Sequence, residues 1–247
     1  MSLPAQRLAA DPRAPETIED LLRRGLVRRA LTPEARSGQR LSIGTAGLDA
    51  ALGGGLVRGQ VHEIVAAQSA GGTALLWAAL AAALGGGELC ALIDPADAFD
   101  PRGARAAGLE LRRLLWVRPT TLSQALRATE IALEARFALV ALDLADARTT
   151  TQPWARLARR AEKQGSALLV LSRSAQAGAF ASATVALSRA QPRWEGSPGT
   201  PGRLLRAGAT LGAVARSRRG PPSAPLLLQL PVPEESALRE PGLEGAE

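Results

Sequence analysis

A strand, a turn of small residues and a helix follow one another in VHEIVAAQSAGGTALLWAALAAALG, the stretch from residue 61 to residue 85. Its β-branched start predicts a strand over 60–65, and its alanine-leucine run predicts a helix over 73–84. The alternation continues along the chain, where the runs ELCALI, FALVALDL and SALLVL are almost continuously apolar. Strands need that composition when helices bury them on both faces of a parallel sheet.

The alternation predicts an α/β fold with a mostly parallel central sheet flanked by helices. Three later runs, at 184–190, 209–217 and 225–230, have no helices between them and predict an antiparallel extension near the C-terminus. A loop rich in proline and glycine is expected at 192–203. The remaining expected elements are strands at 88–93, 113–117, 137–143 and 166–172, and helices near 101–107, at 121–135 and at 153–164.

Three segments are expected along the chain. Residues 1–40 hold one helical pattern, PETIEDLLRRGLVRRA, and a linker, and they form a candidate arm for oligomerisation or partner binding. The α/β core is expected to span 41–231. Residues 232–247 are rich in Glu, Pro and Gly, which predicts a disordered tail.

The composition limits the chemistry of this chain. His62 and Cys90 are its only histidine and cysteine, which excludes disulfide frameworks, thiolate metal centres and multi-histidine sites. Of the 30 basic residues all but Lys163 are arginine, and the net charge is +7. Such a charge permits nucleic-acid or acidic-protein partners without proving either. No stretch predicts a membrane span, and a lone cysteine fits a reducing compartment, so we expect a cytoplasmic protein without membrane contact.

The turn after the first strand has the layout of a phosphate-binding P-loop, whose pattern is G-x-x-x-x-G-K-[ST]. In the window AAQSAGGT, Gly71 and Thr73 match that pattern, whereas Ala66 and Gly72 depart from it. Gly72 stands where a lysine normally contacts the β and γ phosphates, a contact worth about 1.5–3 kcal/mol. Backbone N–H groups can still bind an anion, and Thr73 can still ligate Mg²⁺. The alternative is a vestigial loop that only connects a strand to a helix.

Three longer stretches carry a family resemblance. They are LSIGTAGLDAALGGGLVRGQVHEIVAAQSAGGT, then ELCALIDPADAFDPRGARAAGLELRRLLWVRPTTLSQALRATEIAL, and then FALVALDLAD, which contains the Walker-B-like Asp143. Together they resemble the core of bacterial RecA, densely over 41–172 and thinly afterwards. The resemblance implies a RecA-type ATPase core built on a central parallel sheet.

Three functional positions differ from the RecA pattern. The resemblance implies a water-activating glutamate where this chain has Ala96, an adenine-stacking aromatic where it has Gly103, and the phosphate lysine where it has Gly72. The metal-ligand positions for a Mg-nucleotide are retained as Thr73 and Asp143. General-base catalysis alone contributes about 10²–10⁴-fold. We therefore expect no catalytic residue, no required cofactor and no fast ATP hydrolysis, while residual binding of ATP and Mg²⁺ stays open.

Three carboxylates lie in the region of the absent glutamate, namely Asp94, Asp97 and Asp100. One interpretation makes Asp97 a displaced general base. The other is that these aspartates cap the helix expected near 101 or face solvent. The sequence alone leaves both interpretations open, with capping favoured.

The parts of RecA that hold single-stranded DNA are reduced in this chain. The resemblance implies two mobile loops after the Walker-B strand, but little room separates Asp143 from the next helix, and the second loop, AQAGAFASA, is uncharged with Phe180 as its one aromatic. Strand binding needs a positive groove and stacking side chains. The groove candidates are Arg156, Arg159 and Arg160, or Arg216, Arg218 and Arg219, and the alternative for both sets is a solvated face. Weak DNA binding stays open, and filament formation on DNA is not expected.

A RecA-like core with a short C-terminal region and an altered P-loop is similar to the ImuA family, accessory proteins of damage-induced (SOS) translesion DNA synthesis. The resemblance implies an adaptor in error-prone DNA repair and mutagenesis, with no enzymatic activity of its own. Its implied partners are the polymerase-like adaptor ImuB, an error-prone DNA polymerase with its sliding clamp, and RecA. Two alternatives are a DNA-dependent ATPase with an atypical P-loop and a cell-division inhibitor of the SulA type.

The helical pattern at 15–30 is the candidate partner-binding element. Its apolar stripe contains Leu21, Leu22 and Leu26, and its acidic residues come early and its basic residues late, which suits the helix dipole. RecA protomers dock through a helix and a strand near the N-terminus, so the resemblance implies docking in trans. The alternative is that this stripe packs on the chain's own core.

Overall fold

The computed structural model describes residues 39–195, 204–218 and 220–230. All of them belong to the second of two units, 33–247. The predicted helix at 15–30 with Leu21, Leu22 and Leu26, the predicted tail at 232–247, and Arg219 lie outside the described residues. Within the described ranges, no helix is long and apolar enough to cross a membrane.

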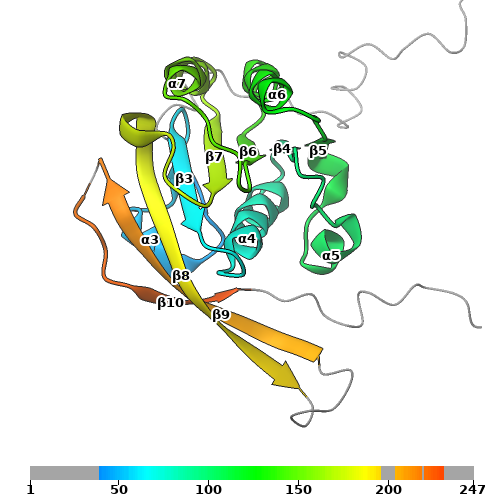
Figure 1. Cartoon of the computed structure of the whole chain (residues 1–247), viewed down its shortest axis with the longest axis vertical. Helices are drawn as coiled ribbons and strands as arrows, with labels where there is room; N and C mark the ends of the chain where they lie inside the picture. The colour runs from blue at the N-terminus through cyan, green and yellow to red at the C-terminus, as the bar shows by residue number, and fades with distance from the viewer. Residues whose placement is uncertain (1–38, 196–203, 219, 231–247) are drawn as a thin grey trace, which may run out of the picture. The chain divides into compact units, whose positions relative to one another are not determined.

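A mixed sheet forms the centre of the described part (Figure 1), with the strand order β10-β9-β8-β3-β7-β6-β4-β5. The strands from β8 to β5 run parallel to one another, and β9 and β10 are antiparallel to their neighbours. The strands are β3 (Val61–Ala66), β4 (Cys90–Ile93), β5 (Leu114–Val117), β6 (Leu139–Asp143), β7 (Ala167–Ser172), β8 (Ala181–Glu195), β9 (Leu204–Ser217) and β10 (Leu226–Leu230). The expected fold class, a mostly parallel sheet with an antiparallel C-terminal part, is confirmed.

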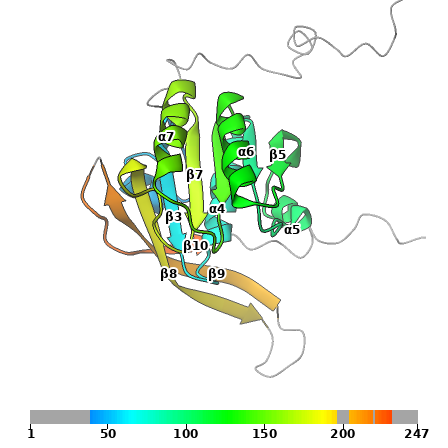
Figure 2. The same ribbon diagram turned by 45° about the horizontal axis from the view of Figure 1, so that its top comes forward.

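Helices cover both faces of the parallel part of the sheet (Figures 1 and 2). Helices α4 (Gly72–Gly85) and α5 (Pro101–Ala106) contribute to the core on one face, and α6 (Leu122–Glu134) and α7 (Gln152–Gln164) to the core on the other. The smaller elements are β1 (Arg40–Leu41), α3 (Ala46–Ala51), β2 (Leu56–Val57), η1 (Leu111–Arg113) and η2 (Gly178–Phe180). The sequence analysis predicted none of these five smaller elements, because each is too short to show a hydrophobic period.

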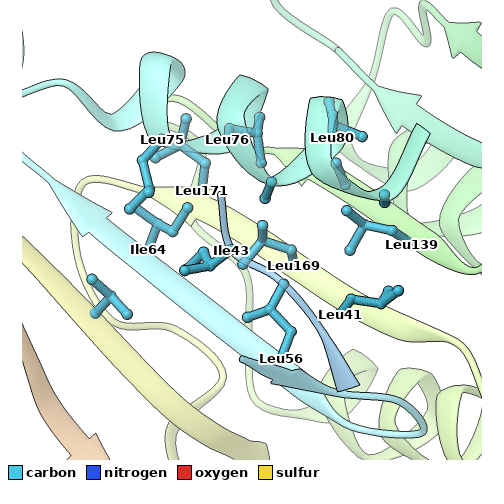
Figure 3. Close-up of a cluster of buried hydrophobic side chains, with 14 of the residues drawn as sticks. Leu41, Ile43, Leu56, Ile64, Leu75, Leu76, Leu80, Leu139, Leu169 and Leu171 are labelled. Atoms are coloured by element: carbon cyan, nitrogen blue, oxygen red, sulfur yellow. The ribbon is translucent and has the colours of Figure 1, made fainter. Parts of the chain in front are cut away.

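Helix α4 lies along the buried strands with leucines facing them (Figure 3). Leu75, Leu76 and Leu80 of α4 are at most 1% exposed and belong to the same core cluster as Leu169 and Leu171 of β7. Full burial of one leucine stabilises a fold by about 1.5–3 kcal/mol. This packing fixes the start of α4, and with it the turn that precedes the helix.

The antiparallel part begins one strand later than the sequence predicted. The run at 184–190 belongs to β8, which is parallel to β3, because residues 173–180 carry the chain from the end of β7 back to the amino edge of the sheet. The predicted loop at 192–203 is also too long, since β8 continues to Glu195 and pairs there with Leu204. Beyond Leu187 the only neighbour of β8 among the described strands is β9. A strand with one open side tolerates a proline such as Pro192.

The single histidine and the single cysteine are buried strand residues. Nε2 of His62 accepts a hydrogen bond from the backbone N–H of Val57 at 3.0 Å, which ties β3 to the preceding strand. Burial raises the pKa of the Cys90 thiol to about 12. A thiol in that state is protonated and unreactive at neutral pH. Both residues therefore serve the core.

Candidate functional site

The predicted P-loop turn connects β3 to α4 in the structure. Ser69 and Gly71 both have positive φ, of 58° and 87°, and this lets the chain turn tightly before α4 begins at Gly72. The turn borders a cavity of about 540 Å³ at the carboxyl edge of the sheet. In open α/β sheets ligands bind at this edge, where parallel strands end and helices begin.

The cavity brings most of the predicted nucleotide-site residues together. Ala66, Gly71, Gly72, Thr73 and Asp143 all line it. Ala66 ends β3, Gly71 lies in the turn, Gly72 and Thr73 begin α4, and Asp143 ends β6, two strands away from β3. The fold therefore brings these five residues to one cavity, and their binding of a nucleotide stays a prediction.

Two further predicted positions, Ala96 and Gly103, are not among the cavity-lining residues. Gly103 is buried in α5, where an added Cβ would lie 2.6 Å from Oδ2 of Asp100 and 3.5 Å from Trp77. A side chain there would collide with the carboxylate that caps its own helix. The packing at Gly103 thus leaves no room for a stacking aromatic in this conformation.

The position of the absent lysine is filled by neighbouring atoms. A Cβ placed on Gly72 would lie 2.8 Å from Cβ of Ala66 and 2.8 Å from Cδ1 of Leu171. Figure 3 shows Leu171 beneath the first turn of α4, next to Leu75. The alanine that replaces the first glycine of the P-loop pattern therefore occupies the space that a side chain at position 72 would need. The two departures from the P-loop pattern, Ala66 and Gly72, therefore belong to one packing arrangement.

The residues that would hold a Mg-nucleotide fit it only in part. Thr73 is exposed at the start of α4, and both Thr73 and Asp143 reach the cavity. Among residues that the structure describes, no three His, Cys, Asp or Glu side chains gather to hold a metal ion. A hydroxyl and a carboxylate suit Mg²⁺ when phosphate oxygens supply further ligands. The packing at Gly72 leaves the lysine contact unmatched.

Asp143 is electrostatically perturbed. Burial raises the pKa of its carboxyl above the ordinary value, and the charge of Asp94 raises it further. The backbone N–H of Ala145, which donates to Oδ1 at 2.9 Å, and the guanidinium of Arg173 act in the opposite direction. A carboxylate whose charge is disfavoured by burial gains from a cation in the cavity.

The variant Asp143→Asn is expected to be more stable than the wild type at neutral pH. Between the ordinary pKa of an aspartate and the raised pKa of Asp143, the folded protein binds more protons than the unfolded chain, so stability falls as pH rises through this window. Asparagine cannot ionise and keeps an oxygen acceptor for the N–H of Ala145. Melting temperatures measured at acidic and neutral pH should show the advantage of the variant growing with pH. An advantage that is the same at both pH values would contradict the assignment.

Two of the three aspartates near Ala96 have structural roles, and the third is exposed. Asp100 caps α5, accepting hydrogen bonds from the N–H groups of Arg102 and Gly103 at 3.0 Å each, which confirms the capping interpretation. Asp94 is 2% exposed and accepts from the N–H groups at 98 and 99 and from Nε1 of Trp116. The candidate displaced base, Asp97, is 58% exposed, pairs with Arg118, and is not among the residues lining the cavity.

The sequence missed one cation at this site. Arg173 follows β7 and lines the cavity, and its Nε donates to Oδ1 of Asp146 at 2.5 Å. The signal available in the sequence was its position directly after a buried parallel strand, since such strands end at the same edge of the sheet. Arg173 is thus a cation at the cavity, and its guanidinium is paired with Asp146.

The loops that follow β6 and β7 are joined to each other. Gln176 accepts hydrogen bonds from the N–H and hydroxyl of Thr149 at 2.7 and 3.1 Å, and its Nε2 donates to the carbonyl of Ala147 at 2.8 Å. Below them, Oε1 of the buried Glu63 accepts from the N–H groups of Gln176 and Ala177, both at 2.7 Å. These contacts hold the two short loops in one arrangement.

The two sets of arginines proposed as nucleic-acid candidates are placed differently. Arg156 pairs with Glu130 and Arg160 pairs with Glu134, and both ion pairs join α7 to α6. Arg216 and Arg218 donate to the carbonyls of Gly178 and Ala179 in η2. Arg159 has no carboxylate partner among the described residues, and it lines a second cavity together with Arg218. One member of each set, Arg159 and Arg218, therefore lines the same cavity.

The sheet order, the turn between β3 and α4, and the aspartate that ends β6 define a P-loop-type α/β protein. Residues 13–166, more than half of the chain, match the model of the RecA N-terminal domain. The chain belongs to the RecA N-terminal domain family, which confirms the RecA resemblance.

Individual relatives agree with this family. The chain is 43% identical over 93 residues to Protein RecA of Rhizobium leguminosarum bv. viciae, a match that covers 37% of this chain and 26% of the relative. Protein RecA of Bartonella tribocorum is 43% identical over 93 residues, or 37% of this chain and 27% of the relative. Protein RecA of Chlorobaculum tepidum is 40% identical over 117 residues, a match that covers 47% of this chain and 34% of the relative. The matches thus span about a quarter to a third of these curated relatives.

Proposed function

We propose that this RecA-family chain is an ImuA-type adaptor in damage-induced, error-prone translesion DNA synthesis, and that it acts by binding proteins rather than by hydrolysing ATP. The observation that carries the proposal is the packing at Gly72. A working phosphate site needs a long cation there, and the methyl of Ala66 and the side chain of Leu171 fill the space instead. The positions of Ala96 and Gly103 support the same conclusion, since neither residue can activate water or stack on a base.

The joined loops after β6 and β7 give a second line of support. Loops that wrap a nucleic-acid strand must be free to rearrange, whereas Gln176 and Glu63 hold these loops through short hydrogen bonds. Local opening is rare where backbone groups are paired and buried. A core of this kind suits a fixed docking platform.

The proposed partners are an ImuB-type polymerase adaptor, the error-prone polymerase and sliding clamp that work with it, and RecA. Both end strands of the described sheet offer an edge for docking. Strand β5 pairs only with β4 and carries Leu115, which is 45% exposed, and β10 pairs only with β9 and carries Leu227, which is 60% exposed. An edge strand presents unpaired backbone groups to another chain. The arm with Leu21, Leu22 and Leu26 is the second candidate contact.

Co-purification from damage-induced cells, with mass spectrometry, tests the adaptor role. The full-length chain is expected to retain an ImuB-type protein, and Leu22→Ala/Leu26→Ala is expected to reduce that recovery at least about fivefold. Leu89→Ala is the control, because Leu89 is an exposed leucine, 48% accessible, outside the proposed arm. Unchanged recovery by a folded Leu22→Ala/Leu26→Ala variant contradicts the arm assignment, and recovery of no polymerase partner contradicts the adaptor role.

A second candidate function has one observation in its favour. Arg173 lines the cavity with Thr73 and Asp143, so a cation and two Mg²⁺-type ligands meet at the phosphate end of the site. A DNA-dependent ATPase built on Arg173 would bind a fluorescent ATP analogue with Mg²⁺ and release phosphate faster with single-stranded DNA. Loss of that turnover in Asp143→Asn would favour the enzyme over the adaptor.

A further inference from the structure

A second cavity, of about 400 Å³, lies at the amino edge of the sheet. Its walls come from four parts of the chain: the segment 57–61, helix α7, Phe180 at the end of η2, and Arg218 after β9. The P-loop turn lies at the other end of β3, so the two cavities are at opposite edges of the sheet. Cavities of this size take small ligands or single units of a polymer.

Unpaired positive charge gathers in this cavity. Arg159 donates through Nε to the carbonyl of Ala155 at 3.3 Å, and Arg218 donates through Nη2 to the carbonyl of Ala179. Neither guanidinium has a carboxylate partner in the part of the chain that the structure describes. Each keeps further N–H groups for a ligand, since a guanidinium carries five donors. Glu162 is the acidic residue in the lining, so the lining is net positive.

A third arginine adds buried charge at the same place. Arg58 lines the cavity and is 4% exposed, with Nη2 donating to Glu88. Its Nε and Nη1 make no hydrogen bond among the described residues. Glu88 compensates the charge of Arg58, so the uncompensated positive charge of the lining comes from Arg159 and Arg218. The preferred ligand is therefore an anion.

The rest of the lining is apolar and aromatic. Phe180 is half-buried against the core, and Val57, Ala155 and Ala158 continue its surface. A phosphate beside arginines and a base against an aromatic ring are the two contacts by which proteins hold single strands. A carboxylate ligand could pair with the arginines, but it has no aromatic or apolar group to contact Phe180. The lining as a whole suits a nucleotide unit.

We propose that this amino-edge cavity, lined by Arg58, Arg159, Arg218 and Phe180, binds a nucleotide unit of a single-stranded nucleic acid. Arg159 and Arg218 hold its phosphate and Phe180 contacts its base. This site goes beyond the adaptor role and does not depend on which protein partner is bound. It also gives the chain a nucleic-acid contact that does not use the joined loops after β6 and β7.

Fluorescence anisotropy with a labelled oligothymidylate of about 20 nucleotides tests the site. We expect Arg159→Gln/Arg218→Gln to weaken binding at least about tenfold at low salt and to reduce the salt slope by about 1.4, the value for two lost phosphate contacts. Phe180→Leu, which keeps an apolar side chain, is expected to weaken binding about fivefold or more through the lost base contact. Circular-dichroism melts establish that each variant folds.

The matched control is Arg105→Gln/Arg112→Gln, which removes the same charge from two exposed arginines that do not line the cavity. It is expected to change binding less than about twofold. Three results overturn the proposal: no binding by the wild type, equal weakening by the control, or displacement of the oligonucleotide by polyglutamate combined with no effect of Phe180→Leu. The last result would assign the cavity to an acidic protein. Partner recovery does not enter this readout, so this proposal and the adaptor role can fail separately.

Discussion

The double variant Ala66→Gly/Gly72→Lys is expected to bind Mg-ATP about 10- to 150-fold more tightly than the wild type, the range for one charge-assisted phosphate contact. Gly72→Lys alone is expected to gain little. The methyl of Ala66 is fixed to the backbone and lies 2.8 Å from where the new Cβ must sit, so it cannot move aside. Leu171 meets the same Cβ only with the end of a flexible side chain, which can rotate away. Titration of a fluorescent ATP analogue measures the difference.

The steric part of this expectation can be separated from the chemical part. Gly72→Ala adds a methyl alone, and overpacking of that kind destabilises a core by about 1–3 kcal/mol. The backbone at Gly72 is outside the left-handed region, so the cost comes from contacts and not from strain in φ. In a double-mutant cycle measured by urea unfolding, Ala66→Gly should remove most of that cost. Additive effects of the two changes would show that the residues do not share one space.

The variant Glu63→Ala is expected to lose about 3–5 kcal/mol of unfolding free energy. Oε1 of Glu63 accepts two backbone N–H groups of the loop after β7, from the part-buried Gln176 and the buried Ala177, and each would be left without this acceptor at about 1–3 kcal/mol. The cavity left by the removed side chain adds to the loss. Urea unfolding measures the change, and faster amide exchange at Gln176 and Ala177 should accompany it.

Glu63→Gln is the control for this prediction. Glutamine keeps an oxygen for the two N–H groups, and its amide can donate to Thr184 Oγ1, which now donates to Oε2 at 3.3 Å. The loss for glutamine should stay near 1 kcal/mol, the value for one altered hydrogen bond. If alanine and glutamine were equally destabilising, the negative charge of Glu63 would matter more than its acceptor, and the account of the joined loops would be wrong.

The sequence predicted the parts of this fold that depend on local pattern. The apolar runs predicted the buried parallel strands, and the aspartates before residue 101 predicted the capped start of α5, because aspartate favours the N-cap position. The direction of β8 was not predictable in this way. It depends on how residues 173–180 cross the sheet, which no local period reports.

The sequence named five residues that the fold brings to one cavity, but it did not show how they pack. Ala66 and Gly72 are separate departures from the P-loop pattern in the sequence, and only the folded turn brings them into contact with Leu171, about a hundred residues away. Arg159 and Arg218 belonged to different candidate sets for the same reason. Their meeting at one cavity depends on the return of β9 to the amino edge of the sheet.

The contact between Ala66 and the site of any side chain at position 72 also constrains how the gene can change. A lineage that acquired lysine at 72 first would carry a misfit turn, and one that acquired glycine at 66 first would lose packing without gaining a ligand. Neither single step improves the protein, so the present arrangement resists single changes toward the P-loop pattern. Acquiring that pattern requires both codons to change together or a stability reserve large enough to tolerate the intermediate.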